Sequence, residues 1–139
     1  MTAMKSKQIG YWIVTLLVLL PAAGTAILEL FANGPAVTVQ SLRMLGYPLY
    51  LMKIDGVAKL LGAITLMLNR PARLVEWAYA GFSFLFLGAT ASHLLAGDAA
   101  HAPIPFSLFL LLMASYALHR EIRGAVEKQA MVTRRSEHS

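Results

Sequence analysis

The sequence predicts an all-α integral membrane protein, an antiparallel four-helix bundle with a short interfacial helix between spans 1 and 2. Hydrophobic residues make up 58% of the 139 residues and charged residues only 14%, whereas a soluble domain carries roughly 25% charged residues. The apolar residues fall into four long stretches, and most Lys and Arg residues lie in alternate connections between them. The length suits one domain, which we expect to comprise residues 1–139.

Each predicted element follows from an apolar stretch and the residues that interrupt it. A spanning helix needs about 20 residues. The first three stretches have that length, and the shorter fourth begins at prolines, which suit a helix start. Asn33-Gly34-Pro35 ends the first stretch, and the helical spacing of Val39, Leu42 and Leu45 predicts the interfacial helix. The predicted spans are residues 9–31, 49–68, 74–96 and 103–119, followed by a basic tail at 120–139.

The distribution of positive charge predicts the orientation in the membrane. Cytoplasmic connections are enriched in Lys and Arg. The amino end, the tight turn at residues 69–73 and the tail hold nine basic residues, whereas the connection between spans 1 and 2 holds only Arg43. We therefore expect both termini in the cytoplasm. The amino end also resembles a signal peptide, and its cleavage would leave three spans.

Composition excludes several kinds of site. There are no cysteines, which excludes disulfides and thiolate metal sites, and the sequence has no His-Glu-x-x-His signature, phosphate-binding glycine loop or serine nucleophile elbow. We expect His93 to be the only histidine inside the membrane, which disfavours a haem with two axial histidines. We therefore expect no metal and no cofactor other than a bound lipid or quinone. The net charge is +5, and the tail holds five of the twelve Lys and Arg residues, mixed with three glutamates. Such a tail is typical of contact with anionic headgroups rather than nucleic acid.

Polar residues inside the predicted spans form the candidate site. An ionisable group in a bilayer costs about 2.5–3.5 kcal/mol on insertion scales, so it needs a partner or a cavity. On a helical wheel, polar residues follow one face of each of spans 1, 2 and 3, and these faces can converge on one intramembrane seam. The candidate residues are Glu29, Asp55, Lys59, Glu76, Tyr79, Ser92 and His93. Of these, Ser92 lies off the face that Glu76 and His93 share.

Simpler interpretations of the same residues remain open. Asp55 and Lys59 are four residues apart with the acid first, which is the favourable order for a pair within one helix. Glu76 follows Arg73 by three residues and could pair with it at the membrane surface. Residues near the outer surface that could simply lie in water are Glu29, His93, Asp98 and His101.

Several segments resemble the DoxX-like membrane proteins. The matching segments are Gly46-Tyr47-Pro48-x-Tyr50, Lys59-Leu60-Leu61-Gly62, Arg73-x-x-Glu76-Trp77-Ala78-Tyr79-Ala80-Gly81-Phe82, and Gly88-Ala89-x-x-Ser92-His93 followed by Gly97-Asp98. The resemblance extends from Tyr11 to His119. It implies a four-helix bundle in the bacterial inner membrane, and it marks Lys59, Glu76, Ser92 and His93 as the matched polar positions. The family takes its name from a subunit of an archaeal thiosulfate:quinone oxidoreductase.

Two functions fit these observations. The first is a non-enzymatic module that binds a membrane lipid, a quinone-like molecule or a partner membrane protein, including a second copy of the chain, in the polar seam. The alternative is an accessory subunit of a membrane quinone-linked oxidoreductase, in which Glu76, Tyr79 and His93 would pass protons. The converging polar faces, without a catalytic motif, favour the first function.

Overall fold

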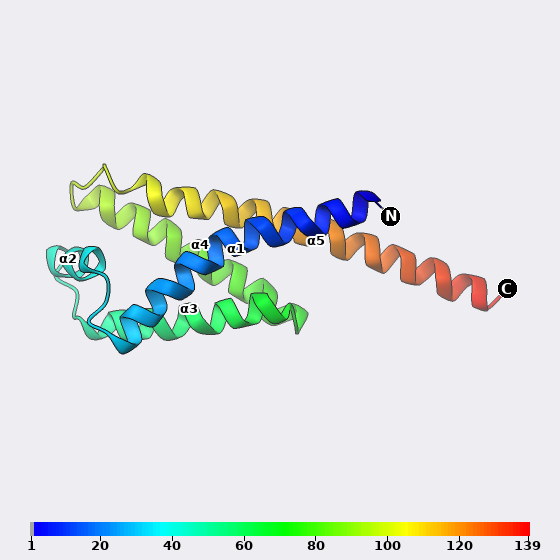
Figure 1. Ribbon diagram of the computed structural model, residues 1–139, viewed down its shortest axis with the longest axis horizontal. Coiled ribbons are helices and arrows are strands. Elements are labelled where there is room, and N and C mark those ends of the chain that lie inside the picture. Colours follow the sequence, from blue (N-terminus) through cyan, green and yellow to red (C-terminus); the bar gives the residue numbers. More distant parts are fainter. Residues whose placement is uncertain (1) are drawn as a thin grey trace.

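A computed structural model describes residues 2–139, which form five α-helices and no β-strand (Figure 1). The helices are α1 (Thr2–Phe31), α2 (Ala36–Met44), α3 (Tyr50–Leu68), α4 (Ala72–Leu95) and α5 (Pro103–Glu137). The four long helices pack in the cyclic order α1, α3, α4, α5, because α1 and α4 each contact both α3 and α5. The predicted all-α class is therefore confirmed.

The connections between helices lie where the sequence places them. α1 ends at Phe31, and Gly34 follows with a φ of +77°, a value that favours glycine. The ammonium of Lys53 donates to the free carbonyl of Leu30 (2.8 Å) at this helix end. α3 ends at Leu68, and the next residue, Asn69, has a left-handed backbone (φ 55°) and donates its N–H to the carbonyl of Thr65. α4 begins at Ala72 directly after this turn and packs against α3, as the tight turn predicts.

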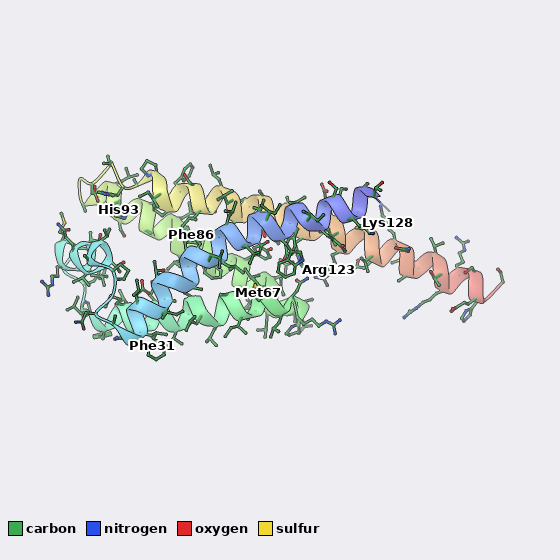
Figure 2. The ribbon with its side chains drawn as sticks, in the orientation of Figure 1. Phe31, Met67, Phe86, His93, Arg123 and Lys128 are labelled. Carbon is green, nitrogen blue, oxygen red and sulfur yellow. The ribbon has the colours of Figure 1, made fainter. Side chains whose placement is uncertain are left out.

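Two helices are longer than the predicted spans. α1 begins at Thr2 rather than at residue 9, and α5 continues to Glu137, so that the predicted tail is largely a helical extension. The reason is intrinsic preference, because these segments contain Lys, Gln, Glu, Arg and Ala and no proline. Arg123 and Glu127 also form an ion pair one turn apart (3.3 Å). Figure 2 labels Arg123 and Lys128 on this extension, whose last turns project beyond the other helices. Its first turn lies beside α1, where Lys7 pairs with Glu121 (3.2 Å).

The interior is filled by apolar side chains from all four long helices. Val18, Leu66, Val75 and Leu112 are almost completely buried. Gly62 is required for the contact between α3 and α4, because a Cβ atom at this position would lie 2.7 Å from the ring of Phe82. The packed centre therefore joins α1, α3, α4 and α5 in one core.

Much of the exterior is also apolar. By length and composition, α1 and α4 qualify as membrane-crossing helices among residues 2–139. α3 has the length of a span but carries Lys53, Asp55 and Lys59 within its nineteen residues. Large apolar side chains nevertheless cover the outside of all four long helices, which is typical of surfaces that face lipid rather than water.

Candidate functional site

A cavity of about 790 Å³ lies between the helices at the end of the molecule where α2 is found, opposite the two termini (Figure 1). All five helices contribute to its lining, which is mostly apolar and includes Leu51, Phe84 and Phe86. Four of the predicted site residues line it: Asp55 and Lys59 from α3, and Ser92 and His93 from α4. Figure 2 labels Phe86 and His93 on α4, with His93 nearer the α2 end.

On the α3 wall, one ammonium group is shared by two carboxylates. Lys59 Nζ lies 2.8 Å from Glu29 Oε1 and 2.6 Å from Asp55 Oδ2. The Glu29 side chain is 0% exposed, and those of Lys59 and Asp55 are 12% and 25% exposed. The expected Asp55–Lys59 pair is therefore present, but it also includes a third group from α1. Glu29 does not lie in water, which corrects the simpler interpretation of this residue.

A close approach of two helices positions Glu29. At Gly56, next to Asp55 in sequence, an added Cβ atom would lie 3.2 Å from the backbone oxygen of Ala26 and 3.3 Å from Cβ of Glu29. Only a residue without a side chain lets α1 come this near to α3. The Glu29 carboxylate consequently reaches the ammonium of Lys59 across the helix interface.

On the α4 wall, His93 belongs to a second polar group. Its Nδ1 lies 3.0 Å from Asp98 Oδ2, and Nδ1 of His101 lies 2.7 Å from Asp98 Oδ1. The turn after α4, with Gly97 at a φ of +76°, returns Asp98 to the helix end. The hydrogen bond with His101, followed by that with His93, lowers the pKa of Asp98 below its usual value. Asp98 and His101 are expected to be solvated, and their side chains are indeed 33% and 53% exposed. The structure adds that the Asp98 carboxylate pairs with both His93 and His101.

Glu76 and Tyr79 lie in a different polar cluster, between α1, α4 and α5. Tyr116 Oη donates to Glu76 Oε2 (2.8 Å), so the partner of Glu76 is a residue of α5 rather than the expected Arg73. The hydroxyls of Tyr79 and Ser115 are 2.7 Å apart, and Ser115 is 2.7 Å from the hydroxyl of Thr15. These hydroxyls satisfy one another inside the core.

A buried histidine was missed in this second cluster. His119 is only 7% exposed, and its ring lies 6.0 Å from that of Tyr11 and 5.8 Å from that of Tyr79, measured between centroids. His93 is therefore not the only histidine inside the helical bundle. The sequence spacing could have indicated this polar face, because Ser115 and His119 are four residues apart on α5 and share a helix face.

The predicted polar faces therefore do not meet in one seam. Asp55, Lys59, Ser92 and His93 gather at the cavity with Glu29 behind them, whereas Glu76 and Tyr79 join the other cluster. A helical wheel shows which residues share a face but ignores their height along the axis. Glu76 and His93 are seventeen residues apart on α4, which corresponds to about 25 Å of helix.

Comparison with known proteins identifies a family. The model of the DoxX-like family matches residues 13–115. This region contains α2, α3, α4, most of α1 and the first part of α5, and hence every residue that lines the cavity. No curated protein and no solved structure matches the chain.

Proposed function

The chain belongs to the DoxX-like family of membrane proteins, and from this premise we propose that it crosses the membrane four times and binds an amphiphile in the cavity. The spans are α1, α3, α4 and the first half of α5. The ligand is a molecule of lipid or quinone type, held without chemical conversion. The observation that carries the proposal is the cavity itself, with its apolar walls and its polar groups from α3 and α4.

The lipid-facing character of all four long helices supports four spans. Each exposes large apolar side chains, for example Leu20 of α1, Leu61 of α3, Leu74 of α4 and Leu110 of α5. The nineteen residues of α3 correspond to about 28 Å of helix, close to the roughly 30 Å of a hydrocarbon core. Lys59 pairs with Asp55 on the same helix and with Glu29 of α1, which lowers the cost of placing these charges in the membrane.

The position of the termini supports cytoplasmic ends in a bacterial inner membrane. Both termini lie at the end of the molecule opposite α2 (Figure 1). Nine of the twelve Lys and Arg residues belong to the amino end, the turn after α3 or the carboxyl end, whereas Arg43 lies on α2. The positive-inside rule then places α2, and with it this end of the cavity, on the outer side.

The size and lining of the cavity support an amphiphilic ligand. Small-molecule sites usually enclose about 300–1,000 Å³, with mainly apolar walls and a few polar groups that orient the ligand. The cavity of about 790 Å³ lies in this range. An apolar chain would lie against Leu51 and Phe84, and its polar end would meet Asp55 or Lys59 on one wall and His93 on the other.

Filling the cavity tests the proposal. Gly88 lines the cavity, and a Cβ atom added there would meet no atom within 4 Å. We expect Gly88→Leu to place its side chain in the cavity and to reduce co-purifying lipid or quinone by about tenfold, measured by mass spectrometry of extracts. Gly81→Leu is the matched control, because Gly81 lies on the same helix with equal free space but outside the cavity. Equal ligand content in both variants would contradict the proposal.

The second candidate function is an accessory subunit of a quinone-linked oxidoreductase. The observation that favours it is His93 on the cavity wall, since an imidazole can exchange a proton with a quinone during reduction. In this case the extract should contain quinone, and a partner subunit should restore quinone-dependent turnover. Lipid without quinone in the extract would argue for the first function.

A further inference from the structure

The polar wall of the cavity has one carboxylate too many. Glu29 and Asp55 share the single ammonium of Lys59. Glu29 Oε2 is buried and has no hydrogen-bond partner among residues 2–139. An unpaired buried carboxylate oxygen is costly. The three groups together therefore lack one positive charge.

The opposite wall contains His93, whose ring is bonded to a carboxylate. His93 Nδ1 is bonded to the Asp98 carboxylate, so in the neutral imidazole the proton lies on Nδ1 and Nε2 is left as an acceptor. Among the lining residues that the structure describes, Lys59 is the single Lys or Arg. The Asp98 carboxylate has its own partners in His93 and His101, so the excess is at the α3 wall, where the carboxylates of Glu29 and Asp55 share one ammonium.

We propose that the cavity binds a cationic amphiphile, whose protonated amine pairs with Asp55 while its apolar part lies against Leu51, Phe84 and Phe86. This inference rests on the proposed function and specifies the class of ligand. With the amine at Asp55, Lys59 is free to pair fully with Glu29, so that Asp55 and Glu29 each have their own ammonium. An anionic headgroup would instead face the carboxylate of Asp55, and a neutral headgroup would leave the charge excess in place.

Three probes with the same apolar chain and different headgroups test this inference. Dodecylamine, dodecanol and dodecanoate are titrated at neutral pH into the purified full chain in a neutral maltoside detergent, and binding is measured by isothermal titration. The signal of the Gly88→Leu variant is subtracted to isolate binding in the cavity. We expect dodecylamine to bind at least about tenfold more tightly than either other probe, a difference of about 1.4 kcal/mol.

Isosteric variants identify the carboxylates that cause the preference for the amine. Asp55→Asn and Glu29→Gln each remove the excess negative charge, so each should reduce the preference for the amine to within about threefold. Glu29→Gln retains the Asp55–Lys59 pair, which keeps the test usable if Asp55→Asn does not fold. Glu76→Gln is the matched control, because Glu76 is bonded to Tyr116 and does not line the cavity, and it should keep the full preference.

The outcomes separate this inference from the proposed function. Equal binding of the three probes, or tightest binding of dodecanoate, would overturn the cationic ligand while leaving an amphiphile site in place. An amine preference that survives both Asp55→Asn and Glu29→Gln would also overturn it. If each probe binds wild type and Gly88→Leu equally, no probe binds in the cavity and the inference fails. The proposed function then fails as well only if the co-purified lipid is unchanged in Gly88→Leu.

Discussion

At the scale of single residues, Lys59 is the group on which the polar side of the cavity depends. Its ammonium connects α1 to α3 through Glu29 and reaches Asp55 one helical turn away. Asp55 faces the cavity, but Glu29 is completely enclosed, and among residues 2–139 Lys59 is its one charged partner. Removal of the ammonium therefore affects the two carboxylates differently, because only Asp55 can be solvated from the cavity.

We expect Lys59→Met to lower the free energy of unfolding by about 3–5 kcal/mol, since it leaves the Glu29 carboxylate buried without a counter-charge. Glu29→Gln in the same chain should recover most of this loss, because the amide needs no counter-charge. Unfolding in mixed detergent micelles, followed by circular dichroism, measures both variants against wild type. Additive losses in the double variant would show that the two residues do not act as a pair.

Asp98 gives the molecule a stability term that depends on pH. Its folded-state pKa is lowered, mainly by the hydrogen bond with His101 and also by that with His93. The pKa of an aspartate in the unfolded chain is about 3.9. A lowered carboxyl pKa stabilises the fold above the unfolded pKa, and this stabilisation is lost as the pH falls through the folded pKa. We expect the Tm of wild type to exceed that of Asp98→Asn near neutral pH and to approach it below about pH 4. A constant difference across this range would contradict the pairing.

At the scale of helices, the contact between α1 and α3 depends on one glycine. Gly56 is buried, and atoms of Leu30, Ala26 and Glu29 lie 3.0–3.3 Å from the place where a Cβ atom would be. One of these atoms is a backbone oxygen, which cannot rotate away. The distance between the two helices, and with it the reach from Glu29 to Lys59, is fixed at this point.

Gly56→Ala should therefore lower the free energy of unfolding by about 1–3 kcal/mol, the usual cost of overpacking. Gly81→Ala provides the comparison, since its Cβ atom would meet nothing within 4 Å. This change should be neutral or stabilising by up to about 1 kcal/mol, because alanine favours helix over glycine. The same unfolding measurement distinguishes them, and equal effects would show that Gly56 has no packing role.

The elements could be predicted from sequence, but their side-to-side alignment could not. Apolar runs and the breaks at Gly34 and Asn69 gave four long helices and the short α2, while helix-favouring polar residues carried α1 and α5 past the predicted ends. The face of each polar residue was also predictable. The bonding partner of a polar residue was predictable only when both residues lie on one helix, as for Asp55 and Lys59. Glu29 and Tyr116 reach their partners across helix interfaces, which depend on how the helices pack.

At the scale of the whole molecule, polar groups gather at two levels separated by an apolar core. Thr15, Tyr79 and Ser115 lie towards the termini, and the cavity lies towards α2. Between them Phe82 and Phe86 stack on each other, with ring centroids 5.8 Å apart. The chain is therefore asymmetric along its long axis, with the binding site at one end and most of the basic residues at the other.

This asymmetry makes the orientation measurable with single cysteines, since the natural chain has none. Gln40 of α2 and Ser136 near the end of α5 are both exposed. We expect a membrane-impermeant maleimide to label Gln40→Cys in spheroplasts and to label Ser136→Cys only after the membrane is opened. The reverse pattern would exclude cytoplasmic termini, and labelling of both in closed spheroplasts would exclude termini and α2 on opposite sides.

The carboxyl-terminal part of α5 is a suitable fusion site for a fiducial protein in imaging. Residues 120–137 are helical throughout, a length of about 27 Å, whereas the headgroup layer is only about 5–8 Å thick on each side. A helical protein fused in register after Glu137 would stand clear of the bilayer on a straight arm. Such a fiducial would make a 15.1 kDa chain large enough to be aligned in electron cryomicroscopy, where the occupant of the cavity could be seen directly.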